Sequence, residues 1–242
     1  MRPVLIVAQG QPSDPMPAAE EIAQLAQRVA ACLPGWSVGS ATLAQPGAIA
    51  AQIRSLGQAG LVYPLFMAGG WFTRVLLPSR MAEAGAVGWQ VLEPLGCDPA
   101  LHRLAVQIIE EAVMSGGLSA QETKVLLAAH GSFKSAIPSD IARHLASLIR
   151  SATQAALVEA AFIDQDPQLA QAVGFGVNSV CLPFFAASGG HVARDIPAAL
   201  AAAGFAGRLL PPIGTDARVP ALIARAIEAA QPICQTVCRY KS

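Results

Sequence analysis

One sequence pattern occurs twice in the 242-residue chain, once in each half. Three kinds of segment recur in the same order: an apolar run ending in a polar residue and a glycine, a segment containing a proline followed by apolar residues, and a segment combining proline, glycine and aspartate. They lie at 4–10 and 125–131, at 63–70 and 182–189, and at 93–98 and 211–216. The offsets are 121 (130 − 9), 119 (183 − 64) and 118 (214 − 96) residues. Such ordered repetition at one spacing indicates a duplicated domain.

Each half alternates apolar strands with alanine-rich helical stretches. The expected strands are 3–9, 36–43, 60–67 and 89–94, then 124–129, 156–163, 178–186 and 208–212; the expected helices are 17–32, 46–57, 74–84 and 99–114, then 138–150, 167–173, 192–203 and 217–230. The strands are continuous apolar runs, which is typical of parallel sheets covered on both faces. We therefore expect an α/β fold of two similar lobes, each a parallel sheet flanked by helices. The expected lobes are 1–116 and 121–242, and the expected linker is 114–120.

Composition excludes several classes of protein. Hydrophobic residues make up 53% of the chain and charged residues 13%, with a formal net charge of zero. This composition favours a large buried core over disorder, and the neutral charge gives no electrostatic basis for binding nucleic acid or an anionic membrane. The N-terminal apolar run is too short for a signal peptide, and no run is long enough to span a membrane. We expect a cytoplasmic, monomeric protein.

The five cysteines do not suggest a disulfide framework, because their number is odd and they are widely spaced. Cys181 lies in an apolar run and is expected in the core. Cys234 and Cys238 are four residues apart near the C-terminus and would supply only two metal ligands. An ordinary terminal helix is the better expectation for that segment.

Polar side chains follow the strands of the second half. His130 follows the first strand, Asp164 and Asp166 follow the second, His191 follows the third after two glycines, and Asp216 follows the fourth. In parallel α/β sheets, ligands bind beyond the carboxyl ends of the strands. A single strand-end histidine is usually structural, whereas two histidines with carboxylates at one sheet edge favour a functional site.

The first half lacks both histidines. Gln9 stands at the position of His130, and Phe72 stands at the position of His191. We therefore expect one functional site per chain, with the first lobe acting as a wall. The other two histidines, His102 and His144, lie in helical patterns and are expected at the surface.

Two motifs of the second half resemble the CbiX-type sirohydrochlorin chelatases, a class II tetrapyrrole chelatase family. One is Ala-His-Gly-Ser at 129–132, and the other is the longer, more specific segment 182–197, which contains Ser188-Gly189-Gly190-His191. The resemblance implies a bilobal chelatase with the macrocycle bound in the cleft between the lobes. It also implies that His130 and His191 coordinate the incoming metal with help from an acidic residue. The family commonly has glutamate there; here Asp164 is the first choice and Asp166 the reserve.

The remaining candidates are glycines that let the backbone approach a ligand and basic residues suited to substrate carboxylates, although each basic residue could also be an ordinary surface charge. The catalytic and metal-binding set is His130, His191 and Asp164, and the substrate-binding set is Gly131, Ser132, Lys134, Ser188, Gly189, Gly190 and Arg194. The family's basic residue after the first motif is displaced here to Lys134, behind Phe133. Arg74 and Arg80 are further candidates for contacting substrate carboxylates.

The expected reaction is ATP-independent insertion of Fe²⁺ into sirohydrochlorin, giving siroheme. Neutral imidazoles are suitable ligands for divalent iron, cobalt and nickel, and they also accept protons. The sequence contains no phosphate-binding loop. The partners are then sirohydrochlorin and Fe²⁺ or Co²⁺ as a substrate metal, with no permanently bound cofactor.

Three alternatives remain at the level of sequence. The first is cobalt insertion into sirohydrochlorin for cobalamin synthesis. The second is a non-catalytic carrier of tetrapyrrole or metal. The third, a two-lobed solute-binding protein, is disfavoured by the strand-end histidines and the lack of an export signal.

Overall fold

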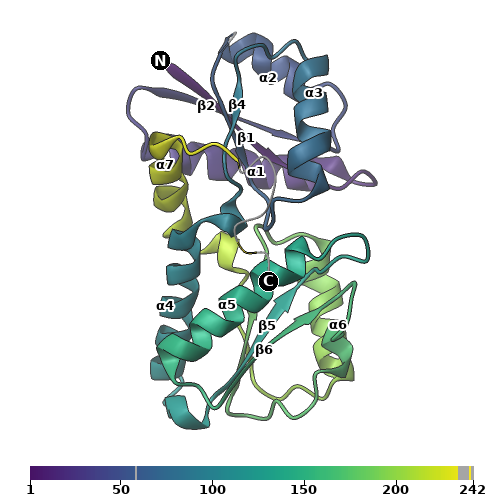
Figure 1. Cartoon of the computed structure of the whole chain (residues 1–242), viewed down its shortest axis with the longest axis vertical. Helices are drawn as coiled ribbons and strands as arrows, with labels where there is room; N and C mark the ends of the chain where they lie inside the picture. The colour runs from purple at the N-terminus through teal and green to yellow at the C-terminus, as the bar shows by residue number, and fades with distance from the viewer. Residues whose placement is uncertain (58, 234–239, 241–242) are drawn as a thin grey trace. The chain divides into compact units, whose positions relative to one another are not determined.

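The computed structural model describes residues 1–57, 59–233 and 240. They form two compact units (Figure 1). Unit 1 contains Met1–Asp98 and the chain that begins at Ala217, and unit 2 contains Pro99–Asp216 together with Tyr240.

Each unit is built on a four-stranded parallel sheet. The strand orders are β2-β1-β3-β4 and β6-β5-β7-β8, so the two sheets have the same topology. The strands are β1 (Arg2–Ala8), β2 (Trp36–Thr42), β3 (Leu61–Pro64), β4 (Gln90–Val91), β5 (Lys124–Ala129), β6 (Leu157–Phe162), β7 (Ser179–Pro183) and β8 (Arg208–Leu209). The expected fold of two similar lobes, each a parallel sheet flanked by helices, is confirmed.

Helices connect the strands in both units. The α-helices are α1 (Pro15–Ala31), α2 (Ala48–Leu56), α3 (Leu77–Glu83), α4 (Pro99–Ser115), α5 (Ile137–Thr153), α6 (Ile196–Ala202) and α7 (Val219–Ala229). Two of these α-helices follow directly on a five-residue π-helix. The π-helix η1 (Phe72–Leu76) precedes α3, and the π-helix η5 (His191–Asp195) precedes α6. Short 3₁₀ turns complete the set: η2 (Leu95–Cys97), η3 (Ala120–Glu122), η4 (Leu169–Gln171) and η6 (Ile213–Thr215). No helix in the described part of the chain is both long enough and apolar enough to cross a bilayer.

The helix expected at 167–173 is only the short turn η4. The segment before it is extended, because the Phe162 N–H donates to the Pro167 carbonyl at 2.9 Å and Gln168 forms a parallel bridge with Phe162. Backbone groups used in that pairing are not available to a helix, so the expectation was wrong there.

The division into units differs from the expected boundary at 116–121. Helix α4 packs against α5 and β7 of unit 2, although it follows β4 of unit 1 in sequence. Helix α7 follows β8 but packs against α1 of unit 1 (Figure 1). Among the described residues, the chain therefore passes between the units at 98–99 and at 216–217. Strand–helix alternation gives the order of elements, but it does not show which sheet a helix covers.

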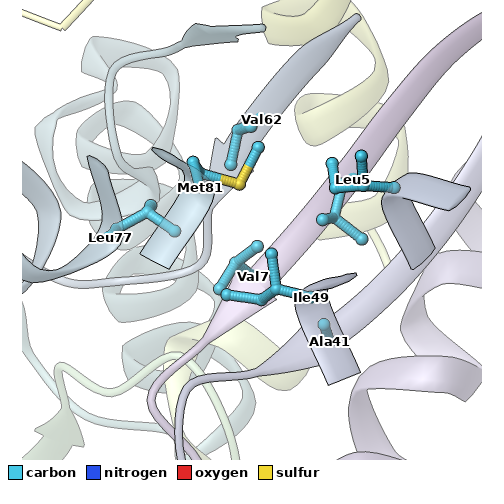
Figure 2. Packing of buried hydrophobic residues seen from close by; sticks show 8 residues of the cluster. Leu5, Val7, Ala41, Ile49, Val62, Leu77 and Met81 are labelled. Carbon is cyan, nitrogen blue, oxygen red and sulfur yellow. The ribbon is translucent and has the colours of Figure 1, made fainter. Parts of the chain in front are cut away.

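Apolar side chains fill both faces of the unit 1 sheet. Leu5 and Val7 of β1 pack with Ile49 of α2 and with Leu77 and Met81 of α3, as Figure 2 shows. Successive strand residues face opposite sides, so the intervening buried residues of β1 point toward the other face of the sheet. Cys181 is buried in the corresponding core of unit 2, as expected. Cys234 and Cys238 lie outside the described residues.

A glycine closes the same turn in both units. The Gly96 N–H donates to the Phe66 carbonyl, and the Gly214 N–H donates to the Phe185 carbonyl, both at 2.9 Å. A Cβ on Gly96 would lie 2.0 Å from the Met67 carbonyl oxygen, and one on Gly214 would lie 2.2 Å from that of Ala186. The two turns need glycine because another backbone segment occupies the space of a side chain. This shared geometry supports the duplication.

Candidate functional site

His130 is the first residue after β5 and lies beside the loop that follows β6. The Asp164 N–H donates to the His130 carbonyl at 2.9 Å, which holds the two strand ends together. Gly131 has φ of +74°, and a Cβ there would lie 2.6 Å from Cγ of Gln165. Glycine therefore lets the chain turn sharply between His130 and the neighbouring loop.

Gln165 supports this loop, although no sequence pattern predicts a role for it. Its Oε1 accepts a hydrogen bond from the Ser132 N–H at 2.8 Å. It thereby ties the turn after His130 to the loop carrying Asp164. Its position between two aspartates was the only available signal, and no spacing rule singles out such a residue.

His191 begins the π-helix η5. Its Nδ1 lies 2.6 Å from Oδ2 of Asp195, four residues later on the same turn. Asp195 is a second residue that sequence reasoning did not select as functional. A signal was present, since residues four apart on one helix face are neighbours. π-Helical turns are frequent at functional sites.

The two histidine rings are adjacent. Their centroids are 4.7 Å apart and their planes meet at 86°. The His130 side chain is 44% exposed and that of His191 is 50% exposed. Strands β5 and β7 are neighbours in the sheet, so their carboxyl ends bring both imidazoles to one accessible edge.

The partners of Nδ1 define the tautomer of each neutral ring. His130 Nδ1 lies 3.1 Å from the Gly131 carbonyl oxygen and 3.4 Å from Oδ2 of Asp164. Its neighbours, like the carboxylate beside His191, are hydrogen-bond acceptors, which favours the neutral tautomer with the proton on Nδ1 in both rings. The Nε2 lone pairs then remain to bind a metal or accept a proton.

The two carboxylates nearest the histidines face their Nδ1 atoms. In the described part of the chain, no group of three or more His, Cys, Asp and Glu side chains is arranged to hold a metal ion. Asp164 and Asp195 instead lie on the Nδ1 side of the histidines. Asp166 is exposed, and Asp164 is the aspartate that lies within 3.4 Å of His130.

The remaining expected site residues surround the histidines in sequence and are mostly accessible. Gly131 is buried, Ser132 and Gly190 are half-buried, and the exposed set is Lys134, Ser188, Gly189 and Arg194. Of the two arginines in unit 1, Arg80 forms an ion pair with Glu83 at 2.8 Å. Arg74 donates through Nε to the Gly69 carbonyl.

One expectation about histidines was wrong. His102 is only 2% exposed, because it lies on the face of α4 that packs into unit 2. Its ring lies 5.6 Å from that of the half-buried His144 and 5.0 Å from that of Tyr240. A helical pattern alone did not show which face of α4 is covered.

The described residues of unit 1 contain no comparable set of donors at this edge of the sheet. The Ala44 N–H donates to the Gln9 carbonyl at 2.9 Å, which is the counterpart of the bond from Asp164 to His130. In η1, Phe72 and Leu76 occupy the positions that His191 and Asp195 occupy in η5. The fold of the site is thus repeated in unit 1, but both histidines and both carboxylates are replaced.

Comparisons with known proteins agree with this duplicated architecture. The CbiX family model matches residues 124–230. A solved structure described as CbiX, the terminal enzyme for biosynthesis of siroheme in denitrifying bacteria, is 45% identical, with a TM-score of 0.88. The match covers 95% of this chain and 99% of that one. A comparison with curated proteins found no match.

More distant structures share the fold. SirB from Bacillus subtilis with Fe³⁺ is 15% identical, with a TM-score of 0.73 over 95% of this chain and 96% of that chain. The sirohydrochlorin chelatase SirB from Bacillus subtilis subspecies spizizenii in complex with cobalt is also 15% identical, with a TM-score of 0.65 over 95% and 94% of the two chains. The similarity to the 45% identical relative extends over almost the whole length of both proteins. On this similarity and on the family match, the chain belongs to the CbiX family.

Proposed function

We propose that the chain inserts Fe²⁺ into sirohydrochlorin to form siroheme, using His130 and His191 as the metal-handling groups. The observation that carries the proposal is the pair of adjacent, half-exposed imidazoles whose Nδ1 atoms face acceptors. Both rings then offer Nε2 to a substrate metal. Family membership supports the same reaction class.

Two imidazole ligands suit a metal ion that the protein must release into the macrocycle. Imidazole nitrogen is a good ligand for iron, cobalt and nickel in the divalent state. A site with only two protein ligands leaves other coordination positions for water and for the nitrogens of the macrocycle. Asp164 and Asp195 act from the Nδ1 side, where a carboxylate orients a ligating histidine.

Insertion also requires proton acceptors. The incoming M²⁺ replaces two N–H protons of the macrocycle, so two protons leave for each metal that enters. A histidine released from the metal accepts a proton at Nε2, and Asp164 and Asp195 offset the resulting positive charge. Lys134 and Arg194 are positioned in sequence beside the histidines to bind carboxylates of the tetrapyrrole, while Gly131, Ser132 and residues 188–190 allow it to approach the backbone.

Iron is the proposed metal because the 45% identical relative is described as a siroheme-forming enzyme. The test is anaerobic incubation of the purified chain with sirohydrochlorin and Fe²⁺, Co²⁺ or Ni²⁺ in turn, followed by absorbance. We expect several turnovers with Fe²⁺ and the highest kcat/KM for that metal. A higher kcat/KM with Co²⁺ would assign the chain to cobalt insertion, since imidazole donors accept either ion. Stoichiometric binding of tetrapyrrole or metal without turnover would indicate a carrier instead.

A further inference from the structure

Unit 1 carries an exposed aromatic surface at the carboxyl end of its sheet. We call Phe66, Trp71, Phe72 and Val75 the aromatic patch. Trp71 is 58% exposed and Val75 is 53% exposed, while Phe66 and Phe72 are half-buried. Large apolar side chains that gather at such an exposed position commonly mark a binding surface.

The rings of the patch lie close to one another. Phe66 and Phe72 are stacked with centroids 6.1 Å apart, and Trp71 meets Phe72 edge to face at 5.3 Å. The backbone below them is also anchored, because the buried Thr73 donates through Oγ1 to the Gly70 carbonyl at 3.0 Å. A preorganised aromatic surface loses little conformational entropy when a ligand binds.

The patch occupies the unit 1 counterpart of the histidine site. Phe72 begins η1 as His191 begins η5, and in both units the π-helix follows the third strand of the sheet. Ligands of parallel α/β sheets bind at this end of the strands. Unit 1 therefore presents flat aromatic rings at a ligand-binding edge where unit 2 presents metal donors.

We propose that the aromatic patch binds the ring system of the tetrapyrrole, an inference that rests on the proposed function. The conjugated macrocycle is planar, and aromatic side chains bind planar π-systems through stacking and edge contacts. Arg74, in the same π-helix, adds a positive charge suited to the peripheral carboxylates of such a ligand. The patch contributes affinity for the macrocycle and takes no part in handling the metal.

The test compares variants in two separate binding measurements. Affinity for metal-free sirohydrochlorin is measured by anaerobic equilibrium dialysis, and affinity for Co²⁺ is measured without tetrapyrrole. We expect Trp71→Ala to weaken sirohydrochlorin binding about tenfold, as expected for the loss of one aromatic contact and its buried area. Trp71→Phe should restore most of the affinity, and both variants should bind Co²⁺ like the unaltered chain. In steady-state insertion, Trp71→Ala should raise KM and leave kcat nearly unchanged.

Val87→Ala is the matched control. Val87 is 83% exposed in the same unit but precedes β4, and therefore lies at the opposite edge of the parallel sheet. This variant should bind sirohydrochlorin with unchanged affinity. Equal affinity of Trp71→Ala and the unaltered chain would overturn the inference, as would equal weakening by Val87→Ala.

Two further outcomes separate the inference from its basis. If the unaltered chain neither binds nor metallates sirohydrochlorin, the proposed function itself fails. If it does both and Trp71→Ala has no effect on binding, only the role of the patch fails. A change of sedimentation from dimer to monomer in Trp71→Ala, with unchanged sirohydrochlorin affinity, would assign the patch to self-association and overturn the inference.

Discussion

At the scale of a single residue, Asp195 orients the imidazole of His191. The contact of 2.6 Å between its Oδ2 and Nδ1 fixes the ring and keeps Nε2 available. We expect Asp195→Leu, which copies Leu76 of unit 1, to reduce Co²⁺ affinity and insertion rate about 10- to 100-fold. Asp195→Asn should lose less, because its amide oxygen still accepts from Nδ1. Titration with Co²⁺ and anaerobic insertion assays measure the two effects.

Asp166→Asn is the control for this substitution, since Asp166 is an exposed carboxylate on the loop beyond Asp164. It should change neither quantity by more than about twofold, as is usual for an exposed charge. Equal Co²⁺ affinity of Asp195→Leu and the unaltered chain would remove Asp195 from the site.

The burial of Cys181 leads to a prediction about how its reactivity depends on pH. Burial raises the pKa of its thiol to about 12, so the reactive thiolate is scarce in the folded protein at pH 7 and remains scarce at pH 9. We expect iodoacetamide to leave Cys181 unlabelled over this range while the exposed Cys32 reacts. Peptide mapping by mass spectrometry reads both sites, and unfolding in urea should make them equally reactive. Rapid labelling of Cys181 in the folded chain at pH 9 would contradict its burial.

The sequence identified some residues of the site and missed others for a physical reason. His130 and His191 could be found because strand ends in a parallel sheet converge on one edge. Gln165 acts through a side-chain contact with the Ser132 backbone, which depends on the path of a loop. Asp195 lay within a recognised motif, but its role follows from the π-helical turn, and hydrophobic periodicity does not reveal such a turn.

At the scale of structural elements, the two glycine turns, at Gly96 and Gly214, leave no space for a larger side chain. We expect Gly214→Ala to destabilise the chain by about 1–3 kcal/mol, because its Cβ must displace the Ala186 backbone. Gly176→Ala is the matched control, since a Cβ there meets nothing within 4 Å. Urea denaturation followed by circular dichroism compares the two variants. Equal midpoints would show that the turn relaxes without cost.

Most elements were predictable because each strand is a continuous apolar run between helical patterns. The exceptions are local backbone features. The segment after β6 stays extended because it pairs with Phe162, which leaves only the turn η4. The two π-helices each add one residue to a turn, and their sequences otherwise read as the start of α3 and α6.

At the scale of the whole molecule, the two units are not consecutive halves of the chain. The sequence repeat indicates the duplication, but the packing of α4 and α7 depends on contacts between residues that are distant in sequence. We expect a fragment of residues 99–216 to unfold cooperatively, because it keeps α4 with α5 and β7. A fragment of residues 121–242 lacks the buried face of α4 and should aggregate or unfold without cooperativity. Thermal circular dichroism of both fragments tests this division, and the reverse order of stability would contradict it.

The most direct test of the central claim is the rate of anaerobic Fe²⁺ insertion into sirohydrochlorin by histidine variants. His130→Ala and His191→Ala should each lower the rate by about 100-fold or more, since each removes a ligand from a site with few donors. Both side chains are half-exposed, so the free energy of unfolding should change by only about 0.5 kcal/mol. Gln9→Ala, at the unit 1 counterpart of His130, should leave insertion largely intact. Near-normal insertion by either histidine variant, or its complete loss in Gln9→Ala, would contradict the account.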